Sequence, residues 1–387
     1  MPRPTAATQT RFTPAGFRSA LLGWYDGNRR ELPWRATRDP YRVWISEVML
    51  QQTTVRTVEP RWRRFLEKYP DVEALARAPL DDVVAEWSGL GYYTRARNLH
   101  AAARRIVEDF SGRVPATFEE LLSLPGMGTY TAAAVASIGF GAPVAVLDAN
   151  VERVIARLDA FATEIRSPAA KRHLSARAQE LLEPARPGDW NQAMMELGAL
   201  VCLPRAPQCA ACPVAAFCAG RVGGTPEDFP VKRPKPPMEE VREVAVVLRR
   251  EARVLILQRP AQGSFAGMWE TPRGRVDEAE PVRDAVVRIA REQTGLECTT
   301  GAPLLRLRHV VMRTKIDLHV WSARQDGGRI KRASHAAHEW TLPAEWLERP
   351  ISTTQKEIAR FLLDGRIPRR AAPVEESPGQ PDLFDGE

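Results

Sequence analysis

The sequence lacks an apolar run long enough to cross a membrane. The longest apolar stretch, AAAVASIGFGAPVAVL, is rich in alanine and is interrupted by Gly139, Gly141 and Pro143, whereas a membrane helix needs about 20 consecutive apolar residues. The first twelve residues, MPRPTAATQTRF, also lack the apolar core of a signal peptide. We therefore expect no association with a membrane and a cytoplasmic location.

Cysteine is scarce as well, and its distribution is uneven. Four of the five cysteines fall in the run CLPRAPQCAACPVAAFC, where six, two and five residues separate them. In a reducing compartment, thiols this close together indicate a metal centre rather than disulfides. The run has no histidine and only one C-x2-C pair, so it favours a [4Fe–4S] cluster, with structural zinc as the alternative. The four candidate ligands are Cys202, Cys209, Cys212 and Cys218.

The charge is positive and unevenly placed along the chain. The formal net charge is +7, and residues 371–387 contain five acidic residues and no basic residue, which leaves +12 on the rest of the chain. A polyanion is the natural partner for a body of that charge. From charge alone, an arginine-rich and well-solvated surface is the alternative.

The length of 387 residues allows two or three domains. Residues 15–222 predict a succession of helices, and the proline and glycine of GGTPEDFPVKRPKPP then break any periodic element. Beyond that break, VAVVL, RVLILQR and KIDLHVW predict strands, with a helix over 281–294 between them. The chain is thus predicted to be multidomain. Its predicted parts are an all-α domain over 1–222, a linker over 223–240, an α/β domain over 241–369 and a disordered tail over 370–387.

A helical hairpin is predicted in TFEELLSLPGMGTYTAAA. Thr117 and Glu120 form a capping box at the start of one short helix, and a turn through Pro125, Gly126 and Gly128 leads into the next helix. The glycines allow the backbone to approach a ligand, and the first amides of the second helix favour an anion. The turn therefore predicts a phosphate contact made by the backbone, with an ordinary helix-helix turn as the alternative.

Two carboxylates are candidates for chemistry. Asp148 follows the apolar run PVAVL and precedes an amphipathic helix, a position that by itself indicates a helix cap. Glu47 lies on a helix that begins after Asp39, on the same face as Trp44 and Gln51. Among apolar neighbours its pKa would rise and it could act as a general acid, whereas an exposed helical glutamate is the alternative.

The cysteine spacing, the hairpin with Asp148 about twenty residues later, and WISEVMLQQT around Glu47 together resemble the MutY-type adenine DNA glycosylases of the endonuclease III superfamily. The resemblance covers residues 15–222 and implies an all-α helix-hairpin-helix glycosylase domain with a [4Fe–4S] loop over 202–218. It also implies that Glu47 protonates the leaving adenine and that Asp148 stabilises the cationic sugar, supported by Asn150. Two carboxylates around one bond are the usual arrangement for glycoside cleavage.

Tyr130 separates two classes within that superfamily. Relatives that also cut the DNA strand carry a lysine at the matching point of GTYTA. A phenol cannot form a Schiff base with the sugar, whereas a lysine can. Tyr130 therefore predicts a monofunctional enzyme that leaves an abasic site.

Further residues are assigned to DNA and to the base pocket, on the matching stretches LPWR, GLGYYTRARNLH and NQAMMELGA, on the helix of Glu47 and on the hairpin turn. Gln52 and Tyr92 are expected to insert into the duplex, and core packing is the alternative for Tyr92. The residues assigned to DNA are Trp34, Arg35, Gln52, Leu90, Tyr92, Pro125, Gly126 and Gly128. Those assigned to the substrate pocket are Trp44, Gln51 and Glu196.

Residues 241–369 resemble the Nudix-like domain with which adenine glycosylases recognise 8-oxoguanine. A working Nudix hydrolase needs three carboxylates in REUxEE, but the matching RIAREQ places Ile289 and Gln293 at two of those positions. Magnesium-dependent pyrophosphate hydrolysis is therefore not expected. The relatives' Phe-Ser-His turn is replaced by Val311, Met312 and Arg313. Losing two polar groups weakens the expectation that 8-oxoguanine must lie opposite the adenine.

The resemblance implies that the partner is double-stranded DNA with adenine mispaired with 8-oxoguanine or guanine. It also implies a monomer associated with the nucleoid. The segment QPDLF, Gln380 to Phe384, resembles a peptide that docks on the sliding clamp. Three alternatives are a thymine or uracil mismatch glycosylase on the same scaffold, a non-catalytic lesion-binding protein, and a Nudix pyrophosphohydrolase.

Overall fold

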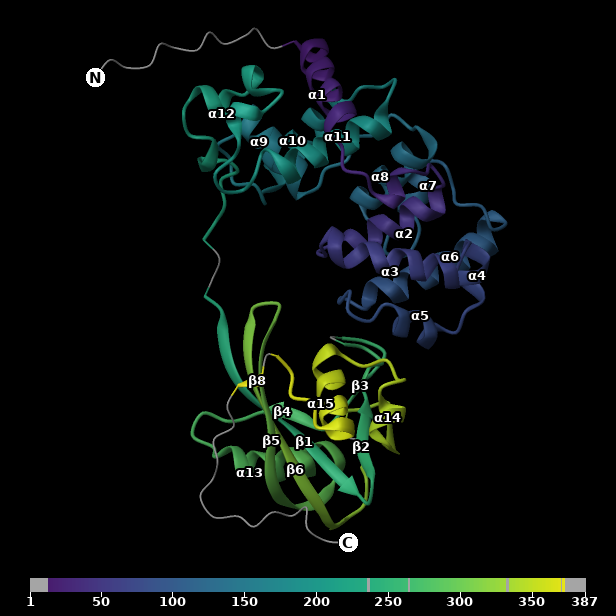
Figure 1. Cartoon of the computed structure of the whole chain (residues 1–387), viewed down its shortest axis with the longest axis vertical. Helices are drawn as coiled ribbons and strands as arrows, with labels where there is room; N and C mark the ends of the chain where they lie inside the picture. Colours follow the sequence, from purple (N-terminus) through teal and green to yellow (C-terminus); the bar gives the residue numbers. More distant parts are fainter. Residues whose placement is uncertain (1–12, 235–236, 264, 332–333, 370, 373–387) are drawn as a thin grey trace, which may run out of the picture. The chain divides into compact units, whose positions relative to one another are not determined.

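The computed structural model describes the chain except for residues 1–12, 235–236, 264, 332–333, 370 and 373–387 (Figure 1). The chain forms two compact units that alternate along the sequence. The helical unit comprises Met1–Ala78 and Asn98–Lys235, and the sheet unit comprises Pro79–Arg97 and Pro236–Glu387. The predicted clamp peptide lies outside the described residues and stays a prediction.

The helical unit is built from α-helices and short 3-10 turns, which confirms the predicted all-α class. Its first helices are α1 (Pro14–Asn28), α2 (Pro40–Leu50), α3 (Val55–Lys68) and α4 (Val72–Arg77), and α6 (Thr94–Phe110) enters it at Asn98. Then follow α7 (Phe118–Leu122), α8 (Thr129–Phe140), α9 (Ala149–Leu158), α10 (Pro168–Leu181), α11 (Pro187–Leu200) and α12 (Ala219–Val222). Among the described residues, no helix is long and apolar enough to span a bilayer.

Local signals set the starts of the helices that carry the site. Asp39 accepts hydrogen bonds from the amides of Tyr41 and Arg42, with Pro40 in the first turn of α2. Asp148 caps α9 in the same way. Both caps were predicted, because a short carboxylate satisfies amides that the helix itself leaves unpaired.

Helix α8 is the centre of the helical unit. Residues 131–138 are buried around its whole circumference, and small alanines let α2 and α11 approach it closely. A Cβ added at Gly188 would lie 2.8 Å from the carbonyl oxygen of Ser137, so the start of α11 touches the end of α8. This packing brings side chains of α2, α8 and α11 to one place.

The sheet unit contains one mixed sheet with the order β3-β2-β1-β6-β5-β8, while β4 pairs with β1 and β7 with β2. Strands β1 and β6 are parallel, and the other pairs are antiparallel. The strands are β1 (Glu239–Arg250), β2 (Arg253–Gln258), β3 (Trp269–Glu270), β4 (Arg273–Arg275), β5 (Leu296–Val311), β6 (Thr314–Gly328), β7 (Ala337–Thr341) and β8 (Ala371–Ala372). Its helices are α5 (Leu80–Glu86), α13 (Val282–Thr294), α14 (Pro343–Trp346) and α15 (Thr353–Asp364).

Alternation along β1 divides the core of the sheet unit into two layers. Val244 and Val246 face one layer with Ile289 of α13, and Ala245 faces the other with Ile358 of α15. Successive side chains of a strand point to opposite faces, so one strand serves both layers. The α/β class predicted for this part of the chain is confirmed.

Two features differ from the sequence-based division. Strand β1 begins at Glu239, inside the range 223–240 predicted as linker. Residues 79–97, which interrupt the predicted helical domain, belong to the sheet unit. Long-range contacts of this kind leave no local signal in the amino-acid composition. The predicted domain limits stay predictions.

Candidate active site

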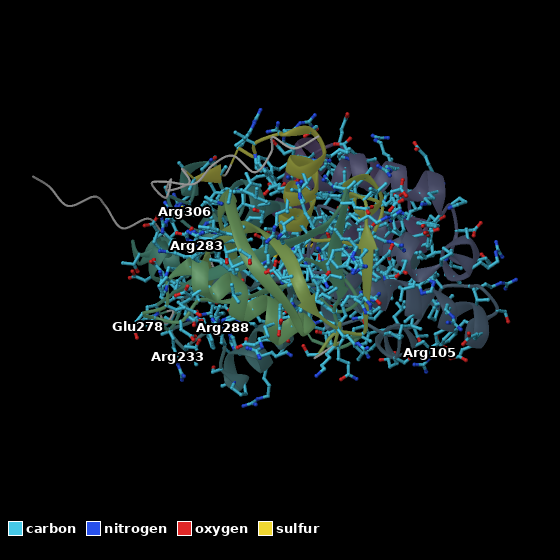
Figure 2. All side chains as sticks on the ribbon, turned by 90° about the horizontal axis from the view of Figure 1, so that it is seen from below. Arg105, Arg233, Glu278, Arg283, Arg288 and Arg306 are labelled. Atoms are coloured by element: carbon cyan, nitrogen blue, oxygen red, sulfur yellow. The ribbon has the colours of Figure 1, made fainter. Side chains whose placement is uncertain are left out.

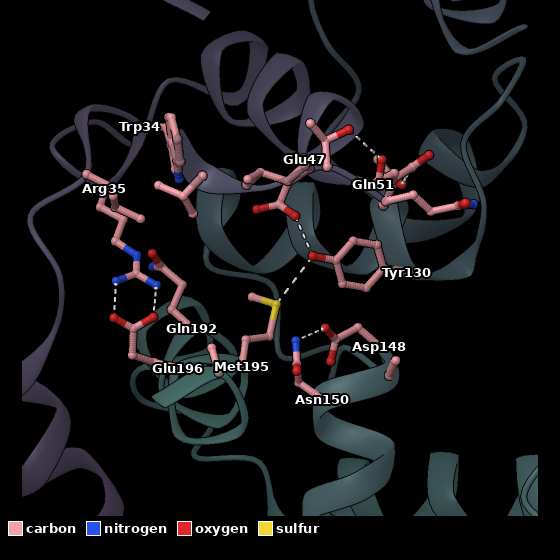
Figure 3. Close-up of a pocket in the computed structure, with 18 of the residues that line it drawn as sticks. Trp34, Arg35, Glu47, Gln51, Tyr130, Asp148, Asn150, Gln192, Met195 and Glu196 are labelled. Atoms are coloured by element: carbon pink, nitrogen blue, oxygen red, sulfur yellow. Dashed lines mark hydrogen bonds and ion pairs between the residues drawn. The ribbon is translucent and has the colours of Figure 1, made fainter. Parts of the chain in front are cut away.

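A cavity of about 800 Å³ opens in the helical unit between α2, α8, α9 and α11 (Figure 3). Its wall contains both predicted carboxylates, Glu47 and Asp148, together with Tyr130 and Asn150. The volume lies in the range typical of small-molecule sites and accommodates a purine. The structure thus brings together four residues that span more than a hundred positions of the sequence.

Glu47 projects from α2 and is buried. Burial raises the pKa of its carboxyl group to about 7, while the hydrogen bond from Tyr130 opposes the rise. Its Oε2 accepts the Tyr130 hydroxyl at 2.5 Å. A carboxyl with this pKa is protonated in about half of the molecules at neutral pH, as a general acid requires.

Tyr130 lies in the first turn of α8. Besides donating to Glu47, its hydroxyl lies 3.3 Å from Sδ of Met195 on α11. Burial first, and then the charges of Glu47 and Asp148, raise the pKa of the phenol well above its usual value. The phenol is therefore a fixed hydrogen-bond donor at physiological pH.

Asp148 occupies the N-cap of α9. Its Oδ1 accepts from the amide of Val151 at 2.7 Å, and its Oδ2 accepts from Nδ2 of Asn150 at 2.8 Å. Burial raises the pKa of Asp148, and these hydrogen bonds oppose the rise. The dipole of α9 favours the anion. Burial, which depends on the tertiary structure, acts in the opposite direction.

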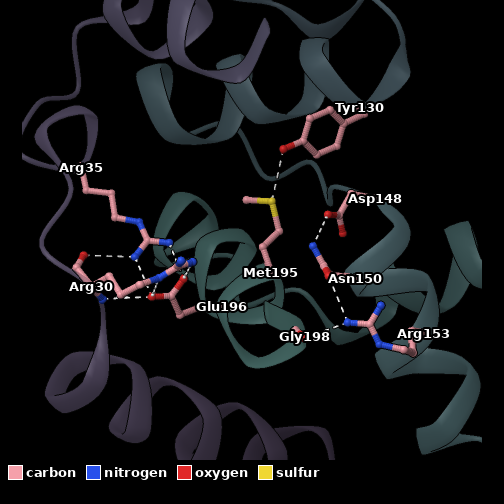
Figure 4. Close-up of polar contacts among 9 residues, drawn as sticks. All are labelled: Arg30, Arg35, Tyr130, Asp148, Asn150, Arg153, Met195, Glu196 and Gly198. Atoms are coloured by element: carbon pink, nitrogen blue, oxygen red, sulfur yellow. Dashed lines mark hydrogen bonds and ion pairs between the residues drawn. The ribbon is translucent and has the colours of Figure 1, made fainter. Parts of the chain in front are cut away.

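Asn150 links Asp148 to a buried arginine (Figure 4). Its Oδ1 accepts from Arg153 at 3.0 Å, and the same guanidinium donates to the carbonyl oxygens of Gly198 and Cys202, each at 2.7 Å. A Cβ added at Gly198 would lie 2.6 Å from Cβ of Asn150, so α9 and α11 meet at this glycine. These contacts fix the amide that orients Asp148.

Glu196 of α11 forms a second charged cluster in the wall. Arg30 and Arg35 both donate to its carboxylate, with shortest distances of 2.6 Å and 2.8 Å (Figure 4). Burial opposes the charge on Glu196, but these hydrogen bonds outweigh it and lower the pKa to about 2. Glu196 is therefore an anion at neutral pH, in contrast to Glu47. The different surroundings of these two glutamates in one cavity move their pKa values apart.

The predicted hairpin turn lies between α7 and α8. Gly126 has a φ of +73°, and a Cβ added there would lie 2.5 Å from Cβ of Asn98, so this turn position requires glycine. Gly128 is the N-cap of α8, and no side chain of a described residue caps that helix. Both glycines line the cavity. The first amides of α8 are thus available to an anion at its rim.

Several residues that were predicted to contact DNA or the base lie in the wall of the cavity. Trp34, Arg35, Gln51, Gln52 and Glu196 line the cavity. Gln52 is exposed and has a φ of +55°, and Nε2 of Gln51 donates to Thr131 at 3.0 Å.

Trp44 was predicted for the substrate pocket, but among the described residues it is not one of those that line the cavity. Its side chain is 1% exposed and packs edge-on against Tyr41. The tryptophan shares a helix with Glu47 but lies in the core, because residues 43–49 of α2 are buried on all sides and only some of them reach the cavity. Leu90 and Tyr92 belong to the sheet unit, where Leu90 is buried and Tyr92 is 52% exposed.

Several wall residues were missed from the sequence, among them Arg30, Gln192 and Met195. Arg30 pairs with Glu196, and Gln192 and Met195 lie on the same face of α11. Positions 192, 195, 196 and 199 all line the cavity and follow the helical period around Glu196. That periodicity was present in NQAMMELGA and would have identified them.

The four clustered cysteines line one small cavity of about 30 Å³ in the helical unit. Arg157 is buried beside it, donates to Sγ of Cys202 at 3.3 Å and accepts from Sγ of Cys218 through its carbonyl oxygen. Among the described residues, no group of three or more potential ligands is arranged to hold a single metal ion. Four thiols around one cavity have the chemistry of the donor set of a [4Fe–4S] cluster, in which each iron takes one thiolate.

The residues that replace the Nudix carboxylates have structural contacts in the sheet unit. Ile289 is 1% exposed, with its Cγ1 3.1 Å from where a Cβ would stand at Gly274, and Gln293 donates to the carbonyl oxygen of Arg273. Arg288, labelled in Figure 2, pairs with Glu280 at 2.5 Å. The helix that carries the metal ligands in a hydrolase is here part of the core.

The turn at Met312 and Arg313 joins β5 to β6. It lies where the sequence comparison expects the Phe-Ser-His turn. Met312 has a φ of +53° and is 81% exposed at the tip of this hairpin. A second cavity of about 570 Å³ lies along the same strands, lined by residues that include Arg308, His309 and Lys315. The lining also contains Glu240 and Asp317, which pair with Lys315 at 2.6 Å and with Arg308 at 3.6 Å, so the groove contains charges of both signs.

Comparison with known families matches both parts of the chain. Residues 45–184 match the HhH-GPD superfamily base excision DNA repair protein, and residues 243–360 match the NUDIX domain. The helix-hairpin-helix glycosylase domain and the strand-rich Nudix-like domain predicted from the sequence are thus confirmed.

Relatives extend the similarity over most of the chain. The adenine DNA glycosylase of Mus musculus is 36% identical and covers 90% of this chain and 78% of its own length. That of Homo sapiens is 35% identical, with 89% and 73% covered. Among solved structures, a thermostable thymine-DNA glycosylase is 32% identical with a TM-score of 0.48, covering 54% of this chain and 95% of its own.

Proposed function

The chain belongs to the adenine DNA glycosylases, which hydrolyse N-glycosyl bonds in DNA base excision repair, and from that premise we propose its substrate and its catalytic groups. The substrate is double-stranded DNA in which adenine is mispaired with 8-oxoguanine or guanine. The enzyme is monofunctional and leaves an abasic site. The observation that carries the proposal is that Glu47 and Asp148 line one cavity large enough for a purine.

The cavity requires the adenine to leave the base stack. A base inside a duplex cannot reach carboxylates that are buried in the protein, so the nucleotide turns outward into the pocket. The turn through Gly126 and Gly128 lies at the rim, where its backbone can hold a phosphate beside the extruded nucleotide.

Glu47 supplies the proton. Tyr130 donates to its Oε2, so the acidic proton of the neutral carboxyl resides on Oε1 and is available to the adenine. When the bond between C1′ and the base breaks, the bonding electrons leave with the protonated adenine and a cation remains on the sugar. Water then adds to C1′, and the proton that it releases returns to the Glu47 carboxylate.

Asp148 stabilises the sugar cation. Two hydrogen bonds to its carboxylate oppose the effect of burial, and the start of α9 adds the positive end of a helix dipole. An anion at this position lowers the energy of the developing charge without itself moving a proton.

Glu196 and its two arginines contribute to recognition of the base. Five hydrogen bonds from Arg30 and Arg35 occupy the buried Glu196 carboxylate, which therefore holds the two guanidinium groups in place in the wall of the cavity. Donors fixed in this way can distinguish the edge of adenine from that of a pyrimidine.

Cys202, Cys209, Cys212 and Cys218 would hold a [4Fe–4S] cluster. When bound, the cluster would cross-link the loop over 202–218, and glycosidic hydrolysis requires no electron transfer from it. Burial raises the pKa of Cys212 to about 12, and bonding to iron would supply the positive charge that a buried thiolate needs.

One excision assay tests the proposed substrate. Duplexes with A·8-oxoG, A·G, T·G and U·G pairs are incubated with the full-length protein, and the products are treated with alkali to reveal abasic sites. We expect excision of adenine from the first two duplexes and intact strands before alkali treatment. Excision of thymine or uracil with no excision of adenine would overturn the proposed substrate.

A further inference from the structure

The loop that follows α5 has an unusual pattern of burial. Leu90 and Tyr93 are 4% and 8% exposed, whereas the side chain between them, Tyr92, is 52% exposed. Residues 79–97 belong to the sheet unit. The loop thus buries its apolar anchors in that unit and presents one aromatic ring to its surroundings.

The backbone of this loop is held in an uncommon conformation. Gly89, Gly91 and Tyr92 have φ values of +86°, +69° and +48°. Glycine adopts this region readily, but for a bulky residue such as tyrosine it is costly and occurs where surrounding contacts enforce it. The position of Tyr92 therefore depends on what holds the loop.

Arg95 holds the loop from within. Its guanidinium donates to the carbonyl oxygens of Leu90 and Gly91 at 2.8 Å and 3.1 Å. The same group lies 5.5 Å from the ring centre of Trp87 and 5.7 Å from that of Tyr92. The Arg95 cation is therefore close to both rings and helps to hold the exposed ring of Tyr92 in place.

Helix α15 and the segment that precedes it also contact the loop. Nζ of Lys356 donates to Oγ of Ser88 at 2.7 Å, and the hydroxyl of Tyr93 donates to the carbonyl oxygen of Ile351 at 3.4 Å. Gln355, the neighbour of Lys356, is buried and accepts from the amide of Thr271 at 3.2 Å. Helix α15 is therefore fixed to the sheet beside the residue that reaches the loop.

We propose that Lys356 is a positioning residue that, through Ser88, holds the Tyr92 loop in the conformation that enters the duplex. The inference rests on the proposed function, because it assigns the exposed ring of Tyr92 to unstacking of the mispaired DNA. By this contact the Nudix-like part of the chain contributes to base extrusion through a loop of its own unit, separately from any contact that it makes to the base opposite the adenine.

The test uses the full-length protein and the variants Lys356→Met and Ser88→Ala. The first keeps the aliphatic stem of the lysine and removes its donor, and the second removes the acceptor. Lys171→Met, at an exposed position of α10, is the control for loss of one positive charge. The substrate is an A·8-oxoG duplex with 2-aminopurine next to the mispair, and the readouts are its fluorescence on binding, the dissociation constant and the single-turnover excision rate.

We expect Lys356→Met and Ser88→Ala each to reduce the fluorescence increase and to weaken binding about 10-fold, the usual effect of losing one charge-assisted hydrogen bond. The double variant should bind no more weakly than either single variant, because both remove one contact. The pH at which the excision rate is half-maximal should not move, since Glu47 is untouched. Lys356→Arg, which keeps a donor, should restore binding, and melting temperatures within a few degrees of wild type would confirm folding.

Different results would overturn the proposed function and the proposed role of Lys356. If the wild type excises no adenine from any duplex, the proposed function fails. If the wild type excises adenine but Lys356→Met and Ser88→Ala behave like Lys171→Met, the proposed role of Lys356 is wrong while the proposed function stands.

Discussion

The hydroxyl of Tyr130 donates a 2.5 Å hydrogen bond to Oε2 of Glu47, from α8 to α2 across the wall of the cavity. This contact does two things. It orients the carboxyl group toward the cavity, and it lowers the pKa of Glu47 against the larger effect of burial, leaving it at about 7. The residue that replaces the lysine of strand-cutting relatives thus also sets the acidity of the proposed general acid.

Replacing Glu47 by glutamine should abolish most of the activity. The amide keeps the shape of the side chain but cannot deliver a proton, so the single-turnover excision rate should fall by about 10²–10⁴-fold while the dissociation constant for the duplex changes little. Glu59→Gln, on the exposed face of α3, is the matched control. Near-normal excision by Glu47→Gln would exclude Glu47 as the acid.

The excision rate should depend on pH through Glu47. Because the protonated carboxyl is the active form and its pKa is about 7, the rate should be maximal below pH 7 and fall tenfold per unit well above it. At low pH, protonation of Asp148, whose pKa burial raises, should reduce the rate again. Single-turnover rates between pH 4 and pH 9 would show this profile, and a rate that rises steadily to pH 9 would contradict it.

Tyr130→Phe should shift the alkaline side of that profile to higher pH. The hydrogen bond from the phenol stabilises the charged form of Glu47, so its removal raises the pKa of the acid further. The shift is independent of any change in the maximal rate, and the pH of half-maximal activity measures it. A shift to lower pH would mean that the phenol stabilises the neutral carboxyl instead.

Asn150→Ala should shift the acidic side. Nδ2 of Asn150 donates to Asp148 and lowers its pKa, so without it Asp148 is protonated at higher pH and the sugar cation loses its counter-charge. Compared with the wild type at the same pH, the variant should be slower at pH 6 and closer to the wild type at pH 8. Asn28→Ala at the exposed end of α1 serves as the control, and an unchanged acidic limb would remove Asn150 from this role.

The cysteine variants test the cluster. Protein purified without oxygen should contain about four iron atoms per chain, and Cys212→Ser should lose iron and melt at a lower temperature. Cys298→Ser, buried in the sheet unit, should keep the iron. Zinc in place of iron, in stoichiometric amount, would favour the alternative metal.

Much of the site could be predicted because its signals are local. Asp148 and Asp39 lie at helix starts that short-range capping rules identify, and the cysteine spacing indicates a metal centre without any fold. The helical periodicity of α11 places Gln192 and Met195 on the same face as Glu196, so these two residues could also have been predicted. By contrast, Trp44 was assigned to the pocket because helical spacing places it near Glu47, yet it lies in the core.

The sequence by itself determined the helical and strand-rich regions, the helix caps and the four thiols, since each depends on neighbours within a few residues. It indicated Glu47 and Asp148 as catalytic candidates only through the resemblance to a family. Only the tertiary structure decided the pKa of Glu47 and the pairing of Glu196 with Arg30 and Arg35. It alone also placed residues 79–97 with the sheet unit. Burial and charge pairing depend on which distant segments pack together, and free energies of that kind are absent from local sequence.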